Sequence, residues 1–197
     1  MPDFFDVVRS QRGVSRFKSD PVPAEALRQI LEAATRAPSG SNRQPWRFVV
    51  VEDRELKARL GELYLEADRR SRGDAPPPPD GPALFTHGMA DVPVVVLPCV
   101  EKWRIQGREV YRGASIYPAV QNLMLAAAAH GLGTRITTRW QYCYDEVAEL
   151  LGVPDDWDIM ALIPLGYPQA PDHLGGSRRK PVPEIAFLDR WGAPWGV

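Results

Sequence analysis

The stretch PSGSNRQPWRF, residues 38–48, joins a polar loop to the beginning of a strand. Before it, Leu27, Ile30 and Ala34 recur at the spacing of one helix face, which predicts a helix over residues 23–36 that Pro38 ends. After it, the apolar run at residues 48–51 predicts a buried strand. The small side chains and backbone N–H groups of the loop form a surface against which a ligand could lie. An ordinary turn has the same composition, so this stretch alone does not establish a site.

The hydrophobic pattern predicts helices and strands along the rest of the chain. The expected helices cover residues 4–9, 23–36, 53–70, 111–130 and 144–151, and the expected strands cover residues 46–51, 92–99, 134–138 and 159–166. The helix over 111–130 is apolar around much of its circumference, which indicates burial on more than one side. The Pro- and Gly-rich segment 72–88 predicts an extended loop. A chain of 197 residues suits a single domain.

Bulk composition excludes several function classes. The chain has 24 Lys and Arg against 25 Asp and Glu, so its net charge of -1 favours neither nucleic acid nor an acidic membrane surface. No apolar run approaches the length of a membrane span, and the N-terminus lacks the features of a signal peptide, so we expect a cytoplasmic protein. Cys99 and Cys143 have no metal-like spacing with the histidines, which predicts reduced structural thiols and no metal site.

Two basic blocks accompany the polar loop: RGVSRF at residues 12–17 and SRRKPVP at residues 177–183. Together the three segments resemble the nitroreductase family of flavin enzymes, whose members carry a basic N-terminal block, a Pro-Ser-x-x-Asn-x-Gln-Pro-Trp loop and a basic C-terminal block. The resemblance implies an α+β fold with a mixed central sheet flanked by helices. It also implies a domain-swapped homodimer with a flavin mononucleotide (FMN) at each subunit interface.

The same resemblance implies which residues hold FMN. Arginine suits the phosphate because its planar guanidinium binds two oxygens at once. The polar loop would come from the partner subunit, and a backbone N–H near residues 136–138 would face the reactive ring nitrogen. The expected cofactor-binding residues are Arg12, Gly13, Ser15, Arg16, Pro38, Ser39, Gly40, Asn42, Ile136, Thr137, Thr138, Arg178 and Arg179.

Two positions of the first basic block depart from the family pattern. Ser15 stands where a basic residue is common, and Gly13 stands where a serine is frequent. A cation near the pyrimidine side of the flavin is therefore either missing or supplied by Arg16. We expect the departure to affect the redox potential more than binding, since positive charge there stabilises the charge that the ring gains on reduction.

The segment GLGTRITT, residues 131–138, begins like a dinucleotide-binding motif but lacks the third glycine and follows a helix. Its glycines also fit an ordinary helix C-cap. The Gly-x-Ser-x-Gly motif is absent, and no histidine has a neighbouring pattern that specifies a nucleophile. We therefore assign no catalytic side chain, which suits an enzyme whose cofactor carries the electrons.

By resemblance, the expected reaction is ping-pong transfer of electrons from NADH or NADPH through FMN to a nitroaromatic, a quinone or a similar electron-poor acceptor. Phe85 and Trp103 are candidates for stacking on that small-molecule substrate, although either suits a core equally well. Other reactions on the same fold remain open, namely reductive dehalogenation and flavin fragmentation, as does a non-catalytic flavin sensor.

The C-terminal segment, residues 175–197, mixes prolines with aromatic residues and has no sustained period. Such an arm cannot form a core of its own, and leaving it in water would expose an apolar patch. It must therefore pack on its own domain or around a second subunit. The apolar helix over 111–130 favours the second subunit.

Overall fold

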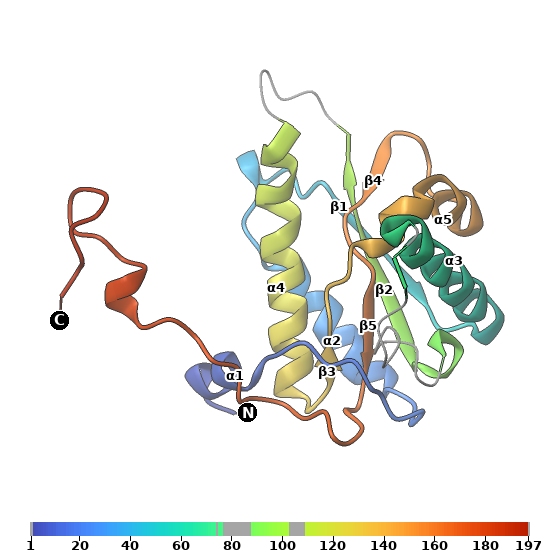
Figure 1. The fold of residues 1–197 in the computed structure, drawn as a ribbon, viewed down its shortest axis with the longest axis horizontal. Helices are drawn as coiled ribbons and strands as arrows, with labels where there is room; N and C mark the ends of the chain where they lie inside the picture. The colour runs from blue at the N-terminus through green and yellow to red at the C-terminus, as the bar shows by residue number, and fades with distance from the viewer. Residues whose placement is uncertain (1, 74, 77–87, 103–108, 197) are drawn as a thin grey trace.

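The computed structural model describes residues 2–73, 75–76, 88–102 and 109–196 (Figure 1). Its α-helices are α1 (Phe4–Ser10), α2 (Ala24–Thr35), α3 (Arg54–Arg72), α4 (Gly113–Ala129) and α5 (Tyr144–Leu151). Its strands are β1 (Trp46–Val51), β2 (Val94–Glu101), β3 (Gly133–Thr134), β4 (Trp157–Ile159) and β5 (Ile163–Gly166). The α+β class expected from the sequence is confirmed.

The strands form one sheet in the order β1-β2-β5-β3, and β4 also pairs with β2. All of these pairings are antiparallel. Within the described residues, the parallel component of the expected mixed sheet is limited to an isolated bridge between Gly13 and Thr134. This bridge attaches the first basic block to the edge of the sheet at β3.

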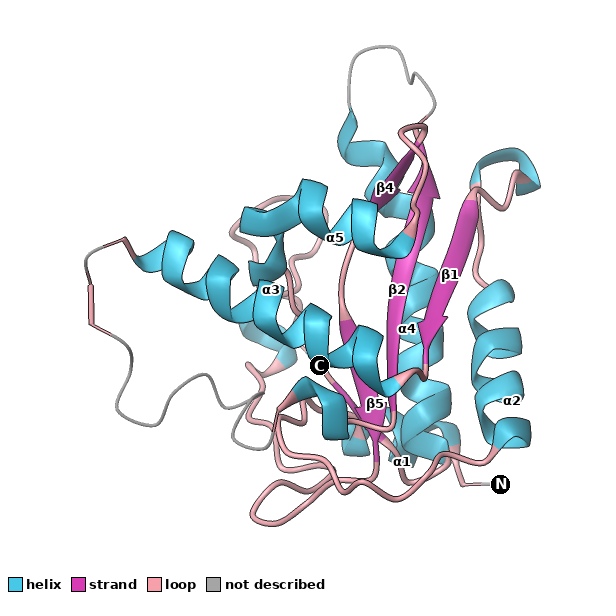
Figure 2. Ribbon diagram, turned by 90° about the vertical axis from the view of Figure 1, so that its right-hand side faces the viewer, coloured by secondary structure: helices cyan, strands magenta, loops and turns pink. Residues whose placement is uncertain are grey.

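Helices cover both faces of the sheet, with α2 and α4 on one side and α3 and α5 on the other (Figure 2). The central strand β2 separates two hydrophobic cores. Its Val94, Val96 and Val100 pack against α2 and α4, whereas Val95, Leu97 and Cys99 pack against α3 and α5. Because side chains of a strand alternate between faces, an unbroken apolar run is what a strand buried on both faces requires.

Three expected strands differ from their predicted bounds. The strand expected over 92–99 is β2, which begins and ends two residues later. The strand expected over 159–166 is divided into β4 and β5, because residues 160–162 lie opposite only residues 97 and 98 of β2. This extra residue is a β-bulge, and the Met160 N–H still reaches the Pro98 carbonyl at 2.8 Å. The strand expected over 134–138 pairs only through Thr134, after which Thr137 turns inward to bridge Leu162.

Several local predictions are confirmed. The Asp53 side chain caps α3 by accepting a hydrogen bond from the Leu56 N–H at 2.8 Å. Cys99 and Cys143 are free and buried. None of the helices in the described ranges has the length and apolar character needed to cross a bilayer.

Helix α4 and the C-terminal arm leave apolar surface exposed in the single chain. One stripe of α4, containing Ala114, Tyr117 and Gln121, is solvent-exposed, while its other sides are largely buried. The arm extends away from the body (Figure 1), and the Trp191 side chain on it is 93% exposed. Its short 3₁₀ turn, Val182–Glu184, is consistent with the absence of a sustained period in its sequence.

Candidate functional site

The first basic block lies across the edge of the sheet and is held there by its apolar residues. Val14 and Phe17 are buried, and the Val14 N–H donates to the Thr134 carbonyl at 3.0 Å. A Cβ at Gly133 would lie 2.5 Å from the Val14 side chain. Only glycine therefore lets the block come this close to β3, and the polar side chains of the block are only partly buried.

Asp172 fixes the middle of the block. Its carboxylate accepts the backbone N–H groups of Ser15 at 2.6 Å and Arg16 at 3.0 Å, and it also forms an ion pair of 3.1 Å with the Arg16 guanidinium. Partial burial alone would raise the pKa of Asp172, but these hydrogen bonds and the nearby charge outweigh it and lower the pKa. The charge of Arg16 is thus compensated within the chain.

Arg12 has different surroundings. Its guanidinium donates to the Gly175 carbonyl at 3.1 Å and lies 3.5 Å from the His173 ring. Within the described part of the chain it forms no ion pair with a carboxylate, so its charge is available to an anion. Arg178 and Arg179 follow on the exposed arm, where the Arg179 side chain bonds the Arg178 carbonyl at 3.0 Å rather than joining Arg12.

Residues 136–138 present backbone groups beside this block. The N–H and C=O groups of Thr137 both bond Leu162 at 3.0 Å, and the Thr137 hydroxyl lies 2.8 Å from the Tyr64 hydroxyl in the interior. Ile136 and Thr138 are exposed, and their backbone N–H groups have no hydrogen-bond partner among the described residues. The C-cap interpretation is also correct, because Gly131 follows α4 with a φ of 74°.

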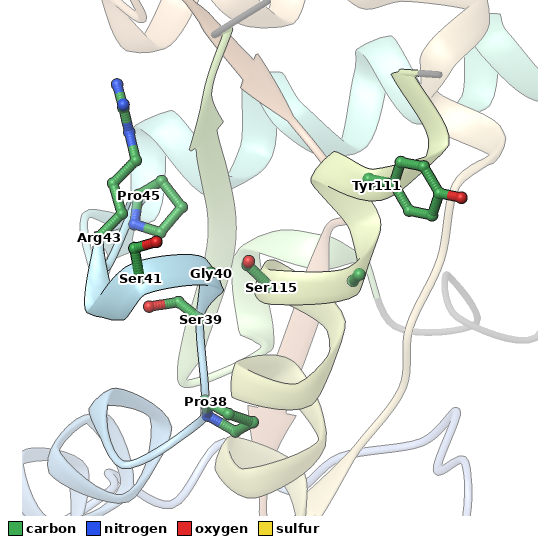
Figure 3. A pocket seen from close by; sticks show the side chains of 9 residues that line it. Pro38, Ser39, Gly40, Ser41, Arg43, Pro45, Tyr111 and Ser115 are labelled. Atoms are coloured by element: carbon green, nitrogen blue, oxygen red, sulfur yellow. The ribbon is translucent and has the colours of Figure 1, made fainter. Parts of the chain in front are cut away.

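The polar loop forms a second site with the start of α4. A pocket of about 580 Å³ lies between them, with the loop on one side and the helix on the other (Figure 3). It is lined by Pro38, Ser39, Gly40, Ser41, Arg43, Pro45, Tyr111, Ala114 and Ser115; Asn42 lies in the loop but does not line the pocket.

The backbone of this loop is unusual. Ser41, Asn42 and Gln44 have φ values of 52°, 53° and 51°, in the left-handed backbone region that residues other than glycine rarely adopt. The Ser39 hydroxyl accepts the Gln44 N–H at 3.0 Å and helps to hold the turn. Such conformations cost about 1–3 kcal/mol each and concentrate at ligand-binding sites.

Apart from Arg178 and Arg179, which lie on the exposed arm, the expected cofactor-binding residues fall into two groups. The basic half-site comprises residues 12–16 and 135–138, and the loop half-site comprises residues 38–45 and 111–115. The Gln11 side chain contacts Met124 of α4 at 3.9 Å, whereas Ser115 lines the loop pocket nine residues earlier. At 1.5 Å per residue the two half-sites are about 14 Å apart along α4. Phe85 and Trp103 lie outside the described residues.

Comparison with known proteins identifies the family. The sequence model described as "Nitroreductase family" matches residues 8–167. The chain belongs to the nitroreductase family. An NADH dehydrogenase from Thermus thermophilus is 33% identical over 90% of this chain and 91% of its own length. An iodotyrosine deiodinase from Thermotoga neapolitana is 30% identical over 87% of this chain and 91% of its own length.

Solved structures agree with the family assignment. The crystal structure of an oxidized iodotyrosine deiodinase bound to FMN and 3-iodo-L-tyrosine superposes with a TM-score of 0.76. It has 26% sequence identity, and the match covers 94% of this chain and 100% of that one. The nitroreductase-like fold is confirmed, and the relatives named above include enzymes of more than one reaction.

Sequence reasoning missed two residues that contact the first basic block. Asp172 lies 156 residues beyond Arg16 and is separated from the basic C-terminal block, so no local pattern connects it to the first block. Arg135 is bonded to Ser15 across 120 residues. A signal for Arg135 was present, however, because it directly precedes Ile136 in a segment that the family resemblance placed beside the flavin.

Proposed function

We propose that the protein is an FMN-dependent oxidoreductase that transfers electrons from NADH or NADPH to electron-poor small molecules, such as nitroaromatics or quinones, by a ping-pong mechanism. The observation that carries this proposal is the basic half-site, which contains a guanidinium without a carboxylate partner among the described residues and also contains free backbone N–H groups. Family membership supports it. The Thermus relative named NADH dehydrogenase supports a nicotinamide as the electron donor.

The donor groups of the basic half-site fit the chemistry of FMN. Its phosphate is a dianion, which the Arg12 guanidinium can bind through two parallel hydrogen bonds. Its ring carries carbonyl oxygens and nitrogens along one edge, and these suit the free N–H groups of Ile136 and Thr138. A free carboxylate nearby would repel the phosphate of FMN. The Asp172 carboxylate is not free, because it is hydrogen-bonded to Ser15 and ion-paired with Arg16.

We also propose a homodimer in which each flavin site combines half-sites from two chains. The half-sites lie toward opposite ends of α4 in one chain. A two-fold axis that sets two α4 helices antiparallel would bring the basic half-site of one chain toward the loop half-site of the other. The exposed stripe with Tyr117 and the exposed Phe4 and Phe5 side chains of α1 would then become buried.

The C-terminal arm fits this arrangement. Ile185, Leu188 and Trp191 are 61%, 55% and 93% exposed, which is a large apolar surface for a segment that extends from the body. We propose that residues 175–197 wrap the partner subunit as a swapped arm. Arg178 and Arg179 would then approach a flavin site in the dimer, which would explain why neither joins Arg12 within one chain.

Bound FMN would supply the redox chemistry, accepting a hydride from the nicotinamide and passing two electrons to the acceptor. The residues of the chain would hold and tune it. Arg12 would bind the phosphate, the N–H groups of Ile136 and Thr138 would fix the ring edge, and the partner's loop would exclude water from one side. Solvent supplies protons in this proposal, so no catalytic side chain is required.

The direct test is anaerobic stopped-flow spectroscopy of the purified protein. We expect yellow protein whose visible flavin absorbance bleaches with NADH or NADPH and returns when a nitroaromatic or quinone is added. Comparing the two nicotinamides gives the donor preference. Protein that neither retains FMN nor takes it up when added would refute the proposal.

Reductive dehalogenation is the second candidate, because the Thermotoga relative is an iodotyrosine deiodinase and the superposed deiodinase structure holds 3-iodo-L-tyrosine. In that reaction 3-iodotyrosine takes up two electrons and a proton and releases iodide, leaving tyrosine. Measuring iodide release after reduction with dithionite separates the candidates. Rapid iodide release together with negligible oxidation of NADH and NADPH would favour the dehalogenase.

A further inference from the structure

Arg135 contacts both positions at which the first basic block departs from the family pattern. Its guanidinium donates a hydrogen bond to the Ser15 hydroxyl. Its side-chain stem passes over Gly13, where an added Cβ would lie 3.8 Å from the Arg135 Cγ. That distance is an ordinary van der Waals contact, so a side chain at position 13 would pack directly against Arg135. The two departures and Arg135 thus form one packed set.

The charge of Arg135 differs from that of its neighbour Arg16. Arg16 is paired with Asp172, whereas Arg135 is held by a neutral hydroxyl and forms no ion pair within the described ranges. Arg135 is also exposed, and it directly precedes Ile136, whose backbone N–H has no partner among the described residues. Its positive charge is therefore available to a ligand at the position where Ser15 itself offers none.

The two uncompensated arginines of the basic half-site lie toward different ends of it. Arg12 is bonded to Gly175 and lies near His173, at the end from which the C-terminal arm departs. Arg135 is bonded to Ser15 and directly precedes Ile136, at the end where the free N–H groups lie. An elongated ligand with an anionic group at one end and a ring at the other would meet the two cations separately.

We propose that Arg135 supplies the cation at the ring end of the flavin site, in place of the basic side chain that position 15 lacks, while Arg12 serves the phosphate end. This inference rests on the proposed binding of FMN. Positive charge at the ring end favours the reduced ring, which carries more negative charge than the oxidised ring. Arg135 would therefore set the potential of the flavin as well as add to its affinity.

The test compares Arg135→Gln with the parent protein in two measurements that do not depend on turnover. The first is the dissociation constant of the apoprotein for FMN and for riboflavin, which lacks the phosphate. We expect both ligands to bind about tenfold more weakly, by the same factor, because the lost contact is to the ring. Arg12→Gln should instead weaken FMN and leave riboflavin nearly unchanged.

The second measurement is the midpoint potential of bound FMN. A tenfold loss of preference for the reduced form lowers the potential of a two-electron couple by about 30 mV. Arg135→Lys, which keeps the charge, should retain most of the parent potential. Adding Ser15→Lys to Arg135→Gln should restore it, because the cation then comes from the first block. A purely structural role for Arg135 would give no such rescue.

A matched control is Arg54→Gln. Arg54 is an exposed arginine at the start of α3 that pairs with Asp91 at 2.9 Å and belongs to neither half-site, so its loss should change neither affinity nor potential. Circular dichroism of each apoprotein checks that the variants are folded. If Arg135→Gln does not fold, Arg135→Met, which also removes the charge, gives the same comparison of potentials.

Two outcomes would overturn the inference. One is a midpoint potential in Arg135→Gln equal to that of the parent, and the other is a weakening confined to FMN, which would place Arg135 at the phosphate. A parent apoprotein that binds neither FMN nor riboflavin would instead refute the proposed function. The failure of Arg135 and the failure of flavin binding are thus distinguishable.

Discussion

Replacing Asp172 with alanine should loosen the middle of the first basic block and destabilise the protein. The carboxylate accepts two backbone N–H groups and one guanidinium, and its side chain is only 20% exposed. A hydrogen bond to a charged group contributes roughly 1.5–3 kcal/mol. Because the freed groups of Ser15 and Arg16 regain contact with water, we expect the total loss to be nearer the effect of one such bond than of three, about 3 kcal/mol.

The assay for Asp172→Ala is thermal unfolding at a fixed protein concentration. For a chain of this size each kcal/mol lowers Tm by about 2–4 °C, so the expected decrease is about 6–12 °C. Asp155→Ala is the control, because the Asp155 side chain is exposed and has no hydrogen-bond partner among the described residues. It should change the free energy of unfolding by less than about 0.5 kcal/mol.

The pH dependence gives Asp172 a second signature. Its pKa is lowered in the folded state, so its stabilising contribution is fully present above the unfolded value of about 3.9 and is lost as the pH falls through the folded pKa. The difference between the parent protein and Asp172→Ala should therefore be constant near pH 7 and narrow below about pH 4. Equal stability of the two proteins at pH 7 would refute the role given to this carboxylate.

Three other predictions concern the close contact at β3, the C-terminal arm and the buried thiols. Gly133→Ala places a Cβ 2.5 Å from Val14 and should lower the free energy of unfolding by about 1–3 kcal/mol. The double variant with Val14→Ala should recover part of that loss. A Gly133→Ala protein as stable as the parent would contradict the close contact. Ending the chain at Gly176 should give a monomer with little FMN affinity, and a flavin-loaded dimer in sedimentation would exclude the swapped arm. Burial raises the pKa of the Cys99 thiol to about 11, so Ellman's reagent at pH 8 should label Cys99 only after unfolding; rapid labelling of the native protein would show that the thiol is accessible.

Local periodicity predicted much of the fold. The bounds of β1 agree with the sequence expectation because the polar loop before it and Asp53 after it delimit the apolar run. Helix α4 was expected a little too long, since its exposed flanks have compatible composition but lie outside the regular helix. The bulge between β4 and β5 was missed because an apolar run reports burial but not the register between strands.

The candidate site was predictable only in part. Composition and family resemblance indicated the basic block and the polar loop, but not that α4 holds them about 14 Å apart in one chain. That separation is set by tertiary packing, through the contact of Gln11 with Met124 and the position of Ser115. Asp172 and Arg135 depend on pairings between distant segments, which no local spacing encodes.

The alternating side chains of β2 have a consequence for how the molecule comes apart. Val96 belongs to one core and its neighbour Val95 to the other, so β2 contributes side chains to both hydrophobic cores. Detaching either pair of helices would expose one face of β2 to water and destabilise the core on its other face as well. The two cores should accordingly unfold together as one cooperative unit. A destabilising substitution in the core beside α3 should therefore also lower the stability of the core beside α4.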